Sequence, residues 1–175
     1  KGTKSAGVSR QYSGTAGRVE NCQIGVFLAY TTASECAYVD AQLYLPEVWT
    51  KDRDRCREAG IPKDVQFQTK PQLALQMLKR AHEIDGPVPW VLADEVYGKS
   101  QELRTWLEGQ KQSYVLAVSC NLSVRLAGRK AREARRVDEV VAGLGGEAWQ
   151  CLSAGAGSKG PRLYEWAWLE AESSR

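Results

Sequence analysis

One aspartate, Asp94, occupies a position where an acid can do chemistry, because it directly follows the apolar residues 90–93. Four apolar residues between a proline and an acid are typical of an interior strand buried on both faces, as in a parallel sheet. Open α/β sheets bind ligands at the carboxyl ends of such strands. A carboxylate there suits Mg2+, which takes one or two carboxylates together with substrate phosphates. The alternative, which spacing alone favours, is that the Asp94 side chain only caps the following turn.

Other residues of chemical interest are given structural interpretations. His82 is the only histidine and falls in the last turn of an expected helix, where positive charge suits the helix dipole. The five cysteines are widely spaced without a C-x-x-C pair, which predicts free thiols in a reducing compartment. The glycine-rich residues 155–160 lack the Walker A pattern, because Pro161 stands where a helix should begin. We expect a connector loop there, with contact to a nucleic-acid backbone as the alternative.

Basic residues gather in two stretches, although the net charge is only +3. Residues 1–18 contain no acid, and residues 125–136 contain Glu133 as their only acid. Such patches can bind the phosphate groups of a nucleic acid. The alternative is that they form a helix face exposed to solvent. The candidate nucleic-acid contacts are Arg10, Arg18, Arg125, Arg129, Lys130, Arg132, Arg135 and Arg136. Trp149, Trp166 and Trp168 offer base stacking, although packing in a core is the commoner fate of such aromatic residues.

Composition excludes several classes of protein. Hydrophobic residues make up 43% and charged residues 26%, which argues against wholesale disorder. The apolar runs are too short to span a bilayer, and the first residues do not form a secretory signal.

The first half of the chain predicts a hairpin followed by helices. Residues 10–18 are rich in turn formers, residues 22–30 alternate as a half-buried strand does, and residues 35–45 supply its antiparallel partner. Thr50 is the expected cap of a helix over residues 51–59. Thr69 and Gln72 form a capping box before a helix whose apolar face ends before Gly86.

The second half predicts a β-α-β unit. Residues 90–93 and 114–118 are expected to be buried strands, joined by a helix that Ser100 caps and Gly109 ends. Beyond it we expect a basic helix within residues 129–144 and a glycine-rich loop over residues 154–160. The predicted class is α/β with a mixed sheet.

Six motifs then resemble, in the same order along the chain, the hallmarks of bacterial insertion-sequence DDE transposases. They are S-R-Q-Y-S-G-T-A-G-R-V-E-N-C-Q (residues 9–23), L-Y-L-P (43–46), A-G-I-P (59–62), T-K-P (69–71), A-D-E-V-Y-G (93–98) and L-S-A-G-A-G-S-K-G-P-R-L-Y (152–164). Together they extend over nearly the whole chain.

This resemblance implies a ribonuclease H-like catalytic domain, with a mixed five-stranded sheet flanked by helices and interrupted by a partial insertion toward the C-terminus. Three acids hold two Mg2+ ions in such domains, and the second acid matches Asp94, which favours a metal ligand over a cap. The first Asp is expected upstream of Lys1 and the final Glu beyond Arg175. Residues 1–118 would belong to the catalytic core, and residues 119–175 to the insertion and the start of the return to the core.

Two other acids are rejected as members of the set. Glu165 lies where the family more often has Asp, on a strand-like segment. Glu95 is expected on the opposite face of the strand from Asp94.

The implied function is metal-dependent cleavage at transposon ends followed by strand transfer, with Mg2+, or alternatively Mn2+, as two ions in the complete site. The implied partner is double-stranded DNA, as terminal inverted repeats and target, bound by a homodimer that assembles on DNA in the bacterial cytoplasm at the nucleoid. We expect the 175 residues alone to be inactive. The alternatives are a decayed remnant that binds DNA without catalysis and a stand-alone ribonuclease H-like nuclease.

Overall fold

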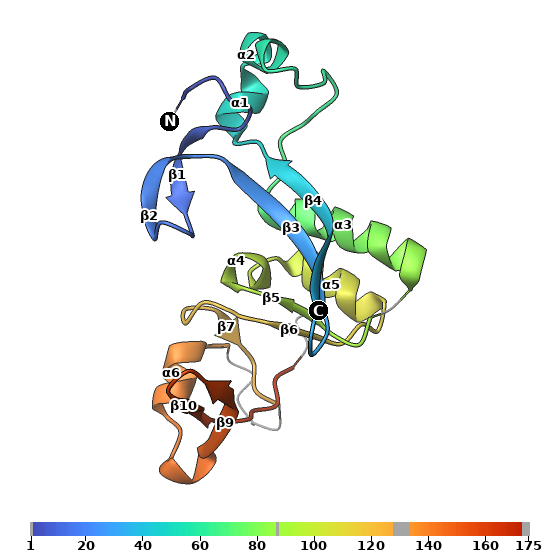
Figure 1. Ribbon diagram of the computed structural model, residues 1–175. Coiled ribbons are helices and arrows are strands. Elements are labelled where there is room, and N and C mark those ends of the chain that lie inside the picture. The colour runs from blue at the N-terminus through green and yellow to red at the C-terminus, as the bar shows by residue number, and fades with distance from the viewer. Residues whose placement is uncertain (1, 87, 128–133, 173–175) are drawn as a thin grey trace. The chain divides into compact units, whose positions relative to one another are not determined.

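The computed structural model describes residues 2–86, 88–127 and 134–172 (Figure 1). The chain forms two compact units, Lys1–Ala117 and Val118–Arg175, which are described separately below. The α/β class is confirmed, because the chain combines helices with strands and contains one parallel strand pair joined through helices. Among the described residues the strands pair only two by two, so the expected continuous mixed sheet is not present there. No helix of this described part is long and apolar enough to cross a membrane.

The first hairpin of the first unit pairs β1 (Ser9–Ser13) with β2 (Arg18–Cys22) in antiparallel register. The prediction of a turn-rich segment over residues 10–18 was therefore too broad, since only residues 14–17 form the turn. Gly17 has a φ of +63°, a conformation that glycine adopts without steric cost. Cys22 belongs to β2, so the next strand begins two residues later than expected.

The hairpin predicted over residues 22–30 and 35–45 is confirmed as β3 (Ile24–Thr31) paired with β4 (Cys36–Tyr44). The register shifts between Leu28 and Ala29, which leaves Val39 as the extra residue of a β-bulge. One face of this hairpin buries Val26. The opposite face exposes Phe27 and Tyr38, whose ring centroids lie 5.3 Å apart.

Two short helices follow, α1 (Glu47–Lys51) and α2 (Arg53–Glu58). Thr50 was expected to cap a helix, and this was wrong, because Thr50 lies inside α1 and Asp52 accepts the capping hydrogen bond from the Arg55 amide. Trp49 is fully buried and donates its indole N–H to the Val8 carbonyl at 2.7 Å. Because the Trp49 side chain is buried, residue 49 belongs to α1. The next helix therefore begins at Arg53 and not at residue 51 as predicted.

The long helix α3 (Lys70–Asp85) has the predicted capping box between Thr69 and Gln72. It ends at Gly86, which has a φ of +71°. Leu73 and Met77 pack with Val26 of β3, and Leu75 packs on a different group of residues that belongs to α5. The helix α3 therefore joins two core clusters of the first unit.

The expected β-α-β unit is present as β5 (Val91–Ala93), α4 (Glu95–Gly98), α5 (Gln101–Gly109) and β6 (Tyr114–Leu116). The strands β5 and β6 pair in parallel, as predicted. Burial on both faces was wrong: Leu92 is 70% exposed and its cross-strand partner Val115 is 56% exposed. Val91 packs in the cluster with α5, so helices cover one face of this strand pair and leave the other open.

The second unit begins with β7 (Ser123–Val124) paired antiparallel with β8 (Arg135–Arg136), followed by α6 (Val137–Ala142). The basic helix expected within residues 129–144 is corrected in its described part, since residues 135–136 are a strand and the helix begins at Val137. Residues 129–133 of that prediction lie outside the described residues.

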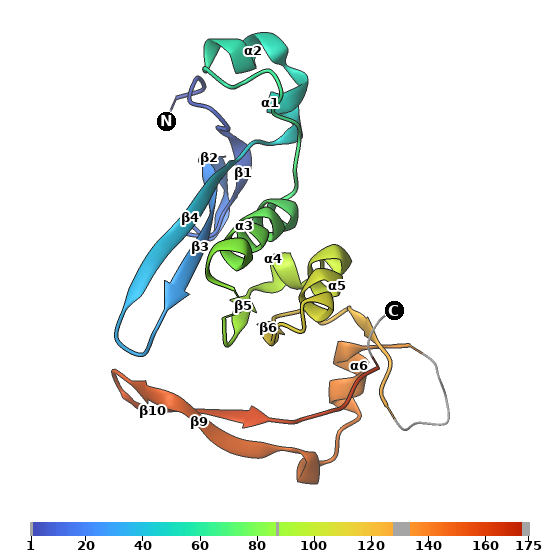
Figure 2. The same ribbon diagram turned by 90° about the vertical axis from the view of Figure 1, so that its right-hand side faces the viewer.

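The second unit continues with the 3-10 helix η1 (Gly146–Ala148) and the hairpin of β9 (Gln150–Gly157) and β10 (Gly160–Trp166). Figure 2 shows β9 and β10 as an extended two-stranded ribbon. The glycine-rich loop expected over residues 154–160 was therefore wrong. Gly155 and Gly160 adopt positive φ values of +97° and +113° within the hairpin, so these glycines accommodate its irregular backbone and do not end its strands.

Candidate active site at Asp94

Asp94 lies at the carboxyl end of β5 and immediately before α4, as the sequence predicts. Hydrogen bonds at both ends of β5 fix its pairing with β6: the Val91 amide donates to the Ser113 carbonyl, and the Ala117 amide donates to the Ala93 carbonyl, each at 3.0 Å. The position of Asp94 therefore depends on a parallel strand pair and not on a mobile connection.

The Asp94 side chain is exposed and uses one oxygen as a helix cap. Its Oδ1 accepts a hydrogen bond from the Val96 amide at 2.9 Å. The Asp94 carbonyl accepts from the Tyr97 and Gly98 amides at 3.1 and 3.0 Å. Within the described part of the chain, Oδ2 of Asp94 has no hydrogen-bond partner. The two interpretations of Asp94 are therefore compatible, because one oxygen caps α4 while the other stays available.

Tyr97 is the titratable neighbour of this carboxylate. Burial raises the pKa of the Tyr97 hydroxyl, and the negative charge of Asp94 raises it further. Both effects disfavour the phenolate, so Tyr97 is neutral at physiological pH. It contributes a ring and a hydroxyl to the surroundings of Asp94 and no negative charge.

The two rejected acids take other positions. Glu95 was expected on the opposite face of a strand, and this was wrong, because it stands in the first turn of α4. Its carboxylate pairs with Lys99 at 2.8 Å on the exposed side of that turn. Glu165 lies on β10 of the second unit, opposite Cys151 in the register.

Two candidate nucleic-acid contacts belong to the first hairpin. Arg10 is exposed on β1, and among the described residues its side chain has no ion-pair partner. Arg18 begins β2 and pairs with Glu20 at 3.2 Å. Arg18 thus has an acidic partner, whereas Arg10 has none among the described residues.

The second basic stretch is only partly described. Arg129, Lys130 and Arg132 lie outside the described residues. Arg136 makes two hydrogen bonds to Asp138, at 3.0 and 2.6 Å, and this interaction lowers the pKa of the Asp138 carboxyl.

The other two arginines of this stretch differ in their contacts. Arg135 donates to the Glu139 carbonyl at 3.2 Å. The exposed Arg125 side chain has no partner among the described residues, although its backbone carbonyl accepts from the Glu172 amide.

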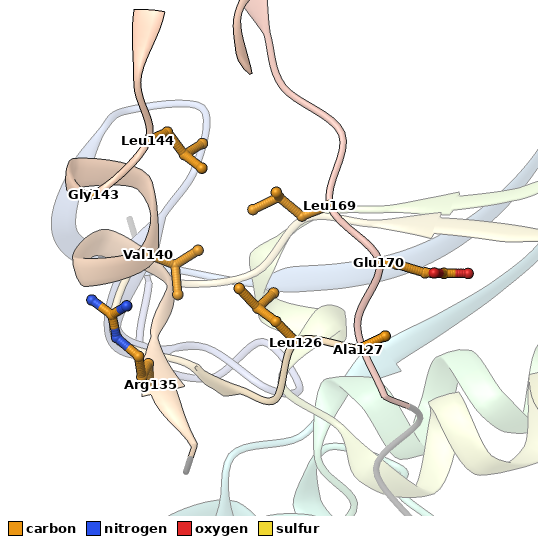
Figure 3. A pocket seen from close by; sticks show the side chains of 8 residues that line it. All are labelled: Leu126, Ala127, Arg135, Val140, Gly143, Leu144, Leu169 and Glu170. Atoms are coloured by element: carbon orange, nitrogen blue, oxygen red, sulfur yellow. The ribbon is translucent and has the colours of Figure 1, made fainter. Parts of the chain in front are cut away.

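The second unit also contains a cavity of about 180 Å3 that the sequence did not indicate. Figure 3 shows Leu126, Val140, Leu144 and Leu169 around it, while the carboxylate of Glu170 points away. A cavity with this apolar lining is suited to packing rather than to acid–base or metal chemistry. Nothing in the sequence could have revealed it, because its walls come from segments far apart in the chain.

Comparison with known proteins decides the family. The model of the DDE superfamily endonuclease family matches residues 1–139, which is most of the chain. The chain belongs to this family. A curated relative, the probable transposase for insertion sequence element IS701 from Microchaete diplosiphon, is 28% identical over 170 residues. The match covers 86% of this chain and 42% of the relative. No solved structure matches the chain.

DDE superfamily nucleases generally use divalent metal ions, and the chemistry of Asp94 fits one ligand of such an ion. Its available oxygen is a hard, anionic donor at the open end of a strand, which Mg2+ prefers over nitrogen or sulfur ligands. No group of three or more His, Cys, Asp or Glu residues suited to a metal occurs within the described ranges. Asp94 therefore fits a metal as a single carboxylate ligand.

Proposed function

We propose that this DDE family chain is part of a transposase that cleaves DNA at the ends of an insertion sequence and transfers the strand to a target. In this proposal residues 1–118 belong to the catalytic core and residues 119–175 to an insertion and the start of the return to the core. The observation that carries it is the exposed Asp94 carboxylate at the carboxyl end of a parallel strand, whose Oδ2 has no hydrogen-bond partner among the described residues.

Asp94 would serve as one of the carboxylates that hold the metal. Two Mg2+ ions, or Mn2+ in their place, would activate the attacking hydroxyl and stabilise the leaving oxygen of the phosphodiester. Asp94 itself takes up no proton in this role. Its contribution is a fixed negative charge, and the cap to Val96 restricts the rotation of the side chain that carries this charge.

Double-stranded DNA is the proposed partner, as terminal inverted repeats and as target, bound by a homodimer that assembles on it at the bacterial nucleoid. Lys and Arg contacts to phosphate supply most of the affinity in such complexes. Arg10 and Arg125 are the best placed of the described candidates, because their guanidinium groups are exposed and have no hydrogen-bond or ion-pair partner among the described residues. Arg129, Lys130 and Arg132 remain proposed contacts from the sequence.

The decisive experiment compares Asp94→Asn with Glu95→Gln in the complete protein that contains this chain. Asn keeps a side-chain oxygen for the Val96 cap but cannot replace an anionic ligand of a hard cation. We expect Asp94→Asn to bind a labelled inverted-repeat duplex normally and to lose cleavage by orders of magnitude in Mg2+ or Mn2+. Glu95→Gln, which changes the adjacent exposed acid, should cleave normally. Wild-type cleavage by Asp94→Asn would refute the proposed role of Asp94.

A second experiment tests the DNA contacts through the salt dependence of binding. Replacing Arg10 or Arg125 by Gln should lower the slope of log affinity against log salt by about one unit for each lost phosphate contact. Arg57→Gln is the control, because Arg57 is an exposed arginine outside both basic stretches and pairs with Asp54 at 2.7 Å. An unchanged slope in the double variant of Arg10 and Arg125 would exclude both residues from the interface.

A further inference from the structure

The helix α4 is too short to hold its own orientation. It consists of Glu95–Gly98, a single turn between β5 and α5. One turn fixes several backbone dihedrals for very few hydrogen bonds, so an isolated turn is unstable in water. The Asp94 carboxylate accepts a hydrogen bond from the Val96 amide of this turn, so the orientation of the carboxylate depends on the orientation of α4. Contacts from outside α4 must therefore determine where Oδ2 points.

Tyr97 supplies the first of these contacts. Its ring packs against the cluster of Val26, Leu73 and Met77, and also against the cluster of Leu75, Leu103 and Leu107. Tyr97 is thus a partly buried side chain that touches both clusters joined by α3. A ring held between two groups of core residues has little freedom to rotate, so the helix that carries it is anchored.

Arg104 supplies the second contact, at the other end of the same turn. From α5, its Nη1 donates a hydrogen bond to the carbonyl of the buried Gly98. Helices leave their last carbonyls without partners, and a basic side chain can satisfy them with a favourable charge. The Ser100 amide also donates to the Tyr97 carbonyl at 2.9 Å. The carboxyl end of α4 is thereby tied to α5.

We infer that Tyr97 and Arg104 are positioning residues for Asp94, and this inference rests on the proposed function. The Tyr97 ring anchors the turn to the core, and the Arg104 guanidinium holds its end. Together they keep Oδ1 on the Val96 amide and Oδ2 directed outward for the metal. The positioning depends on the ring of Tyr97 and not on its hydroxyl, because the contacts that fix it are packing contacts with apolar residues.

The test uses Mn2+ added to the 15N-labelled complete protein that contains this chain, with paramagnetic broadening of the amide signals of residues 94–98 as the readout. Wild type should show broadening that Asp94→Asn abolishes. Tyr97→Phe should behave as wild type, since the ring remains. Tyr97→Ala and Arg104→Gln should need roughly tenfold more Mn2+ or beyond for the same broadening, as is common when a partner of a metal ligand is removed.

Val8→Ala is the matched control for loss of packing. Val8 is 7% exposed and packs with Trp49 and Cys56, in a cluster of the first unit that does not include Tyr97. Val8→Ala should lower the melting temperature without changing the Mn2+ response. If Tyr97→Ala does not fold, Arg104→Gln decides the matter, because it removes a hydrogen bond from a partly exposed side chain and leaves the core intact.

The outcomes separate the two proposals. Absence of Asp94-dependent broadening in wild type would remove the metal role of Asp94, and the positioning inference with it. Broadening in wild type that persists unchanged in folded Tyr97→Ala and in Arg104→Gln would refute the positioning inference alone. A loss of the Mn2+ response in Val8→Ala equal to that in Tyr97→Ala would also refute it, since general destabilisation of the first unit would then suffice.

Discussion

The strand pair β5–β6 and the hairpin β9–β10 are both two-stranded, but they are stabilised in different ways. Helices cover one face of β5–β6, where Val91, Tyr114 and Leu116 pack around the buried Leu103 and Leu107. Along β9–β10 no strand residue is buried, and Leu163 is 61% exposed. Isolated hairpins are marginal in water. Asp94 therefore lies at the end of a strand pair that buried side chains stabilise, whereas β9–β10 exposes side chains on both faces.

The largest expected effect is on the first of these regions. Leu107→Ala should lower the free energy of unfolding by about 2–5 kcal/mol, because the fully buried side chain leaves a cavity between α3 and α5. Urea unfolding followed by tryptophan fluorescence measures this loss. A change below about 1 kcal/mol would show that this cluster does not stabilise the β5–β6 scaffold as the burial indicates.

A leucine-to-alanine change in the hairpin β9–β10 should have a much smaller effect on the free energy of unfolding. Leu163→Ala in β10 removes an exposed leucine side chain, so unfolding should change by no more than about 0.5 kcal/mol. The same urea titration serves as the measurement. A loss as large as that of Leu107→Ala would mean that β9–β10 is covered in solution, and the contrast between the two regions would disappear.

The smallest expected effect is on the pH dependence of stability in the second unit. The hydrogen bonds from Arg136 hold the pKa of Asp138 below its usual range, so the ionised carboxylate stabilises the folded state. This contribution is complete above the unfolded pKa of about 3.9 and is lost as the pH falls through the lower folded value. The protection of the α6 amides, taken as their exchange rate relative to that of an unstructured peptide at the same pH, should fall over that acidic window. Asp138→Asn should remove this pH dependence of the protection, and a loss of protection that already begins near neutral pH would point to another group.

Local signals in the sequence predicted much of the first unit. The side chains of Thr69 and Gln72 each accept a hydrogen bond from the backbone amide of the other, so this capping box needs no distant residue. The alternation around Val26 and the apolar run before Asp94 likewise located β3 and β5. The extent of burial could not be predicted, because the exposure of Leu92 depends on which face of the strand the helices cover.

The predictions were wrong where the local sequence is compatible with two different structures. Thr50 and Asp52 can both cap a helix, and the burial of Trp49 decides for Asp52. Glycines near residue 155 are compatible with a loop or with a hairpin that contains positive φ values, and composition does not separate the two. Asp94 was found from its place after a strand. Tyr97 contacts core residues from distant segments, and Arg104 reaches Gly98 from the next helix; no local pattern in the sequence indicated either contact.

The parallel register of β5 and β6 also sets an order of events during synthesis. Val91 pairs with Tyr114 across the whole of α4 and α5, whereas β1 meets β2 across a four-residue turn. Hairpins close within about 1–10 μs, while a ribosome adds only about 5–20 residues per second. The first hairpins can thus form before β6 has been translated, and β5 waits roughly one second or longer for its partner strand. During that interval Asp94 has no fixed location, so it is among the last positions of the first unit to acquire its native surroundings.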